Sequence, residues 1–145
     1  MRKANKFDLA ECFEMMQSYA LEGPIDAFKD KTKHNQQYIE ELLMSIIAGR
    51  GFVLIEEGKG IIVAAIVPNL WIPEIRQVKE LAWWVRPEHR GGLTGGKLFL
   101  GFQKYAQELI DVGRADFMSM TLMESSPRMN FESKGFRPIE TTFVR

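Results

Sequence analysis

The stretch that decides the fold of this chain is WWVRPEHRGGLTGGKL, residues 83–98. Its apolar start, up to Pro87, is typical of a strand, and a turn of basic and glycine residues follows. From Thr94 onward the apolar residues have helical spacing. The first turn of a helix has unpaired N–H groups and the positive end of the helix dipole, which together bind anions. Since Arg90 and Lys97 add a positive charge at each end, we expect an anion site here.

The composition describes one globular domain spanning residues 1–145, with 46% hydrophobic and 26% charged residues. Nineteen basic residues balance nineteen acidic ones, so nothing favours nucleic acid or an anionic membrane as a partner. The single cysteine, Cys12, fits a reducing compartment. The longest apolar run, Ile61 to Val67, is too short to span a bilayer. We therefore expect a cytoplasmic protein.

A first helix is predicted from Asp8 to Leu21, with a short strand before it. Asp8 is followed three residues later by Glu11, which is the pattern of a capping box. Gly23 and Pro24 end the helix.

A second helix is predicted from Gln36 to Ala48, where apolar residues again recur at helical spacing and Gly49 is the stop. The segment between the two helices, Ile25 to His34, is polar and rich in lysine. It is expected to be a mobile loop or a short helix.

Three strands are predicted in the middle of the chain. Phe52 to Glu56 and Ile61 to Val67 are rich in β-branched residues and flank a glycine-containing turn, which indicates a hairpin. The strand of the opening stretch runs from Lys79 to Arg86. In the connection before it, Trp71 is expected to pack over the edge of the sheet.

The helix that begins at Thr94 is the longest in the prediction, and Gly113 ends it. Ala115 to Met123 is expected to be a buried strand, with a helix as the alternative. A short helix beginning at Ser125 or Ser126 and a terminal strand, Thr141 to Val144, complete the chain. This order predicts an α/β domain with an antiparallel front half and one parallel crossover through the long helix.

Two motifs in order resemble those of the GCN5-related N-acetyltransferases, the GNAT family. The first is Arg90-Gly91-Gly92-Leu93-Thr94-Gly95, with Val85-Arg86-Pro87-Glu88-His89 before it as the family's usual lead-in. The second is Phe131-Glu132-Ser133-Lys134-Gly135-Phe136, about 40 residues later, where the family has a helix end followed by Gly-Phe. The resemblance implies the GNAT fold: a central mixed, mostly antiparallel sheet with flanking helices and a cofactor cleft between splayed fourth and fifth strands. It is also compatible with a phage-type member.

The resemblance implies that the turn binds the pyrophosphate of acetyl-CoA through its amides. The residues implied at the phosphates are Arg90, Gly91, Gly92, Leu93, Thr94, Gly95, Gly96 and Lys97. The backbone groups of Trp83 and Val85 are implied to contact pantetheine and the thioester carbonyl. Glycine lets the backbone approach a phosphate closely, and each amide-to-phosphate bond is charge-assisted. With two histidines and one cysteine in the chain, no metal site is expected.

Glu80 is the candidate catalytic base. It lies several residues before the turn, at a position that resembles the family's frequent carboxylate base. Its neighbours Leu81 and Ala82 predict a partly apolar setting that raises its pKa. The alternative is a structural carboxylate at the sheet edge, paired with Lys79 or Arg76.

Three residues depart from the family pattern. Leu93 stands where the signature has its second glycine, and Glu124 stands near the position of an asparagine that commonly touches pantetheine. Phe131 replaces the tyrosine that often protonates the departing thiolate, so the general acid is expected to be Ser125, Ser126, a water or no group at all.

The function that the resemblance implies is direct transfer of an acetyl group from acetyl-CoA to a primary amine, on a small molecule or a protein. The acceptor is expected to enter between the loop at residues 23–34 and the terminal strand. The alternative is a non-catalytic CoA-binding or protein-interaction module with the same fold. Because little chain follows Gly135 and Phe136, a partner chain that completes the sheet, and hence a homodimer, is also expected.

Overall fold

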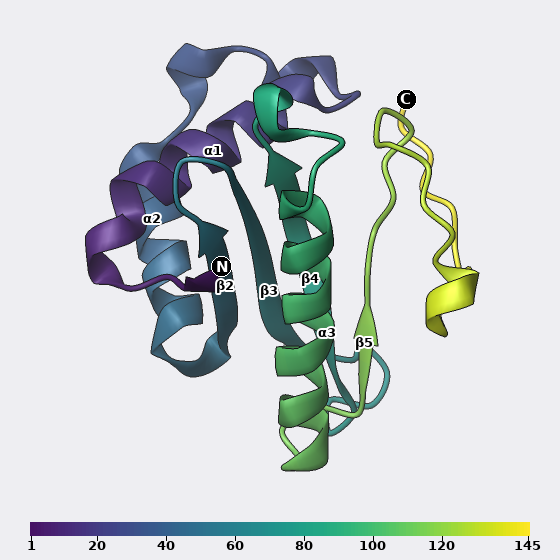
Figure 1. Cartoon of the computed structure of the whole chain (residues 1–145). Helices are drawn as coiled ribbons and strands as arrows, with labels where there is room; N and C mark the ends of the chain where they lie inside the picture. Colours follow the sequence, from purple (N-terminus) through teal and green to yellow (C-terminus); the bar gives the residue numbers. More distant parts are fainter.

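A computed structural model describes all 145 residues and shows a single five-stranded sheet (Figure 1). The strands lie in the order in which they occur in the chain, and every neighbouring pair is antiparallel except β4 and β5, which are parallel. The strands are β1 (Arg2–Lys3), β2 (Gly51–Glu56), β3 (Gly60–Pro68), β4 (Arg76–Val85) and β5 (Phe117–Ser119). The predicted antiparallel front half with one parallel crossover is confirmed.

Three helices cover the two faces of the sheet (Figure 1). They are α1 (Leu9–Glu22), α2 (Gln36–Ser45), which continues into a π-helical turn at Ile46–Arg50, and α3 (Thr94–Asp111). The segment between α1 and α2 forms two short 3-10 turns, Asp26–Phe28 and Lys31–Lys33, rather than one helix. None of the helices combines the length and the apolar character needed to cross a bilayer.

The core consists of two apolar layers, one on each face of the sheet. Alternation along the strands divides them: Val53 and Ile61 pack with residues of α1 and α2, whereas Leu54 and Ile62 pack with residues of α3. Each fully buried side chain of this size stabilises the fold by about 1.5 to 3 kcal/mol. Cys12 is fully buried in the first layer.

One extra residue in β4 changes which face its side chains occupy. Ala64 pairs with Glu80 and Val63 pairs with Ala82, so Leu81 is left over as a β-bulge. Before the bulge, even-numbered residues such as Val78 face α3. After it, Ala82 and Trp84 face α1 and α2, while Trp83 packs on the α3 side.

The pairing of β4 with β5 is short. Only Gln77–Lys79 pair with Phe117–Ser119, although β4 continues for six more residues. Beyond this pairing, the Thr121 N–H donates to the side-chain Oε2 of Glu80 at 3.1 Å. Beyond Lys79, therefore, β4 has no partner strand on its β5 side, and the Glu80 side chain lies where the ladder ends.

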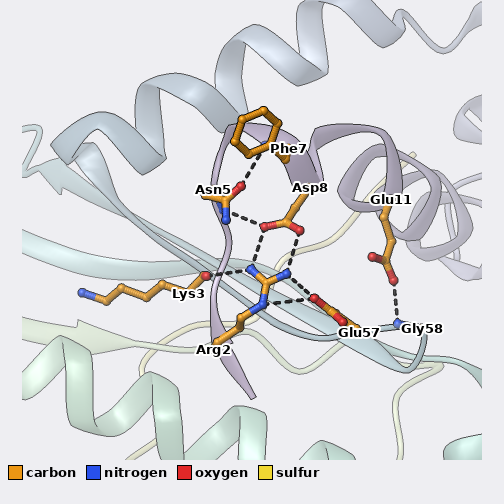
Figure 2. A network of polar contacts seen from close by, with 8 residues as sticks. All are labelled: Arg2, Lys3, Asn5, Phe7, Asp8, Glu11, Glu57 and Gly58. Atoms are coloured by element: carbon orange, nitrogen blue, oxygen red, sulfur yellow. Dashed lines mark hydrogen bonds and ion pairs between the residues drawn. The ribbon is translucent and has the colours of Figure 1, made fainter.

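The start of α1 differs from the predicted capping box. Asn5, not Asp8, caps the preceding turn, and the Asp8 carboxylate accepts the Asn5 N–H at 2.7 Å. The Arg2 guanidinium also binds Asp8, at 2.8 Å, and reaches Glu57 in the β2–β3 turn (Figure 2). Glu11 is used elsewhere, since it accepts the Gly58 N–H at 2.6 Å. The predicted capping box from Asp8 to Glu11 was wrong because Asp8 is itself the last residue of a capping box that begins at Asn5, and its carboxylate also binds Arg2.

The last third of the chain is less regular than predicted. Residues 120–131 form no helix, and a single 3-10 turn, Glu132–Lys134, stands where a helix beginning at Ser125 or Ser126 was expected. The terminal strand Thr141–Val144 is absent, and residues 137–145 make no hydrogen bonds. A strand forms only where a second edge pairs with it, and β propensity does not supply that edge.

The connection between β3 and β4 also differs from its prediction. Trp71 is 84% exposed and does not pack over the sheet. The loop is instead ordered by Asn69, whose side chain accepts the N–H groups of Trp71 and Ile72 at 2.8 and 3.1 Å. These local bonds hold the loop without burial of its apolar side chains.

Two glycines test how tightly the sheet is packed. A Cβ added at Gly51 would lie 2.0 Å from the backbone oxygen of Ala64, whereas a Cβ at Gly96 would meet nothing within 4 Å. We expect Gly51→Ala to lower the free energy of unfolding by more than about 2 kcal/mol through overpacking against the backbone. Gly96→Ala, the matched control in α3, should leave it unchanged or raise it by up to about 1 kcal/mol. Urea denaturation measures both, and equal midpoints for the two variants would contradict the described packing.

Candidate anion and cofactor site

The turn after β4 has the conformation that its sequence predicts. Pro87 begins a single 3-10 turn, Pro87–His89, because its fixed backbone angle suits the first position. Gly91 has φ +79°, in the left-handed region that favours glycine. The chain then enters α3 at Thr94 (Figure 1). A cavity of about 470 Å³ lies over this turn, with Glu56 and Lys59 of the β2–β3 hairpin on its other side.

The backbone N–H groups of residues 91–96 donate no hydrogen bond within the protein. The first backbone bond of α3 is made by the Lys97 N–H, which donates to Leu93 O at 2.9 Å. An uninterrupted row of free donors therefore leads into the positive end of the α3 dipole. The cradle, as we call residues 90–97, has the donors that a phosphate or pyrophosphate group needs.

Both cations of the cradle are already paired with carboxylates. The Arg90 guanidinium binds Glu22 at the end of α1, at 2.6 Å, and its Nε donates to Val85 O at 2.8 Å. The Lys97 ammonium lies 3.3 Å from Glu56 Oε1. Each of the two cations that were predicted to bind the anion thus forms an ion pair with a carboxylate from another element.

Glu56 is the less exposed of the two carboxylates. Its side chain is 13% exposed, against 43% for Glu22. Its Oε2 is buried and makes no hydrogen bond of normal geometry. Burial would raise its pKa, but the Thr94 hydroxyl and the Lys97 and Lys59 ammonium groups outweigh this and lower it. Glu56 is therefore a fixed negative charge in the wall of the cavity.

The open side of β4 begins beside this turn. The Arg86 N–H donates to Lys59 O at 2.8 Å, so Trp84 belongs to the next hydrogen-bonded pair of the antiparallel ladder. By alternation, the backbone groups of Trp83 and Val85 point away from β3, toward the side that β5 leaves open. The backbone groups of the two residues predicted for pantetheine thus lie on the unpaired side of β4, and Val85 O accepts the Arg90 Nε–H.

Glu80 lies in an apolar setting, as its neighbours predict. It is 3% exposed, and burial raises its pKa to about 7, although the Thr121 N–H and the charge of Lys79 oppose the shift. It forms no ion pair with Lys79 or Arg76, and the Arg76 guanidinium donates instead to Gly113 O at 3.0 Å. The predicted structural alternative, an ion pair at the sheet edge, is therefore not formed.

The two adjacent tryptophans, Trp83 and Trp84, lie on opposite faces of the sheet, and both pack against protein. The Trp83 ring stacks on Phe99 of α3 at 5.8 Å, and Trp84 is buried toward α1 and α2. The guanidinium groups of Arg86 and Arg90 each lie 5.9 Å from the Trp84 ring. The indole N–H groups of both tryptophans have no partner.

The residues that depart from the family pattern are spread out. Leu93 is 77% exposed on the cradle. Phe131 packs against Phe99 and Phe136, with ring centroids 6.0 and 5.9 Å apart, and so belongs to an aromatic cluster on α3. Glu124 and Ser126 line a second cavity of about 360 Å³, formed within residues 122–129.

Three residues near the site were not predicted from the sequence: Glu22, Glu56 and Tyr19. Burial raises the pKa of Tyr19 to about 12, and the negative charge of Glu80 adds to the shift. Glu22 and Glu56 are far along the chain from their partners, so no local pattern indicates either pair. The only signal in the sequence is the presence of Arg90 and Lys97, since a charged side chain that becomes partly buried needs a partner of opposite charge.

Solved structures share this fold. No protein-family model matches the sequence, and no curated protein matches it. An acetyltransferase from Trypanosoma brucei is 15% identical with a TM-score of 0.65, and 99% of this chain and 95% of that one are covered. A GCN5-related N-acetyltransferase from Ralstonia eutropha is 18% identical with a TM-score of 0.64 and the same coverage, 99% and 95%. AAC(6')-Iy, in complex with a CoA-based bisubstrate analog, is 17% identical with a TM-score of 0.63, covering 99% and 94%. The predicted GNAT fold is confirmed: this chain folds as the GCN5-related N-acetyltransferases do.

Proposed function

We propose that the protein is an N-acetyltransferase that moves an acetyl group from acetyl-CoA to a primary amine by direct transfer. The observation that carries the proposal is the row of free N–H groups at residues 91–96, which ends in the first turn of α3. A pyrophosphate has the charge and the acceptor oxygens for such a row. The open side of β4 runs away from the cradle in the direction that a pantetheine arm would follow.

The comparison with solved structures supports CoA as the carrier of the acetyl group. AAC(6')-Iy shares the fold and is described in complex with a CoA-based bisubstrate analog. In this chain, the pyrophosphate would lie on residues 91–96, and the pantetheine amides would bond to the backbone of Trp83 and Val85. The Val85 carbonyl has a second lone pair beside the bond from Arg90, so it keeps the capacity to accept another donor.

The chemistry needs one proton acceptor. The amine nitrogen attacks the thioester carbonyl, a C–N bond forms, and the C–S bond breaks to leave the CoA thiolate. The proton lost by the amine goes to Glu80, through water because the carboxylate is 3% exposed. A pKa of about 7 suits this role, since the group is partly ionised at neutral pH and readily takes a proton.

The thiolate takes its proton from solvent in this scheme. Phe131 carries no exchangeable proton, and its ring packs within the aromatic cluster of α3. A thiolate is a good leaving group, so its departure does not require a general acid.

The acceptor amine would approach beside the end of α1. The terminal strand expected on one side of the acceptor mouth is not formed. The Met123 sulfur lies close to Gly23, 3.9 Å from the position of a Cβ added there. The loop that follows Gly23 carries several lysines and two short turns.

The second candidate is a non-catalytic module of the same fold. The observation that favours it is the pairing of Arg90 with Glu22 and of Lys97 with Glu56, which leaves the cradle without a free cation. Acetyl-CoA consumption measured over a panel of primary amines separates the two. Turnover with any amine supports the enzyme, and CoA binding without turnover supports the module.

The cradle can be tested by adding a negative charge to it. A Cβ at Gly95 would make only ordinary contacts, 3.7 and 3.8 Å from Val85 and Trp83, so substitutions there should fold. We expect Gly95→Glu to weaken acetyl-CoA binding by more than tenfold in calorimetry, because its carboxylate would lie among the donors for phosphate. Gly95→Gln, similar in size and uncharged, should weaken binding less. Equal affinities for wild type and Gly95→Glu would rule out a phosphate in the cradle.

The role of Glu80 can be tested by its effect on the rate. We expect kcat of the wild type to rise with pH through about 7, as Glu80 loses its proton. Glu80→Gln should lower kcat by about 100-fold or more and abolish this rise. The same variant should bind acetyl-CoA as the wild type does. An unchanged pH–rate profile would show that another group takes the proton.

Burial of Glu80 also makes a prediction for stability. The pKa of Glu80 is about 7 in the folded protein and 4.5 for an ordinary glutamate, as in the unfolded chain. Between these pH values the folded protein therefore binds more protons than the unfolded chain. Stability should therefore fall as pH rises from 4.5 through 7. At pH 8, Glu80→Gln should be more stable than wild type by about 2 to 3 kcal/mol, and at pH 4 the two should be similar. Urea denaturation at both pH values measures the difference, and a variant less stable at pH 8 would contradict it.

A further inference from the structure

The carboxylate of Glu56 places a negative charge inside the proposed anion site. Glu56 ends β2 and lies in the wall of the 470 Å³ cavity, across from the cradle. Its Oε1 holds the Lys97 ammonium at 3.3 Å and lies 4.0 Å from that of Lys59. The site proposed for a pyrophosphate therefore already contains an anion.

The position of Glu56 is that of an anion bound at a helix N-terminus. Thr94 is the first residue of α3, and its hydroxyl is one of the groups that stabilise the Glu56 carboxylate. Lys97 is one turn further along the same helix. A phosphate placed on the first turn of α3 would face the same hydroxyl, the same ammonium and the same dipole.

The charge of Glu56 is not removed or shielded easily. Its lowered pKa keeps the carboxylate ionised at neutral pH. The Glu56 side chain is 13% exposed, whereas the side chain of Glu22, the partner of Arg90, is 43% exposed. Dissolved salt therefore screens the charge of Glu56 less than that of Glu22. Oε2 is buried and makes no hydrogen bond of normal geometry.

We infer that Glu56 sets the phosphate affinity of the cradle, as a resident anion that competes with the ligand's phosphates for Lys97 and the start of α3. The inference rests on the proposed function. The counter-charge lowers the affinity for phosphate groups in general, so the cradle retains CoA only where the pantetheine arm adds its own contacts along β4. Free phosphate compounds, which lack that arm, bind more weakly than CoA.

The test compares two neighbouring glutamates. Glu56→Gln removes the resident charge and keeps the shape, and Glu57→Gln removes the same charge next to it, outside the cavity, where Glu57 binds Arg2. We expect Glu56→Gln to tighten the binding of CoA and of inorganic pyrophosphate by about fivefold or more in calorimetry at low salt. Glu57→Gln should change either affinity by less than about twofold.

A double-mutant cycle with Lys97→Gln shows whether the competition is for Lys97. The gain from Glu56→Gln should shrink to less than half when Lys97 is replaced, because the two residues interact directly. Thermal melting of each variant confirms that it is folded.

The outcomes separate this inference from the proposed function. If the wild type binds CoA and Glu56→Gln binds it equally or more weakly, the inference is wrong and Glu56 positions Lys97 for the ligand. An equal gain in Glu57→Gln would also overturn it, since the effect would then be one of net charge. If neither the wild type nor Glu56→Gln binds CoA, both the proposed function and the inference fail.

Discussion

The register of β4 against β3 is the constraint on which the rest of the site depends. One extra residue, Leu81, reverses the faces of everything after it. Because of the bulge, Val78 faces the α3 side while Ala82 and Trp84 fill the layer under α1 and α2. A ladder without the extra residue would place Trp84 under α3 and turn the free backbone groups of Trp83 toward β3. The open side of β4 would then offer a different set of donors and acceptors.

The parts of the fold that could be predicted from sequence are those with a strong period. The hairpin of β2 and β3, the helices α1, α2 and α3, and the turn at Gly91 all carry local signals, because spacing and glycine placement act over a few residues. The terminal segment Thr141–Val144 has strand-like residues, but a strand depends on a partner edge, which no local pattern reveals. The capping of the first helix was assigned one turn too late, since Asp8 is the third residue of a capping box that begins at Asn5.

The candidate site shows the same division. The turn, its glycines and the burial of Glu80 follow from neighbours in the chain, because the backbone conformation and the apolar setting are local properties. The charges that surround the turn could not be predicted, since Glu22 and Glu56 reach Arg90 and Lys97 only once the sheet and α1 are assembled. Sequence therefore indicated the position of the turn, and the folded chain shows which carboxylates pair with its cations.

Cys12 has a practical consequence for enzymology. The only thiol of the protein is fully buried, and burial raises its pKa to about 12, so at neutral pH it is neither ionised nor accessible. A reagent that reacts with free thiolates will not modify a side chain of this kind in the folded protein. Any thiol that such a reagent detects during a reaction with acetyl-CoA then comes from released CoA, so turnover can be followed continuously with no signal from the enzyme itself.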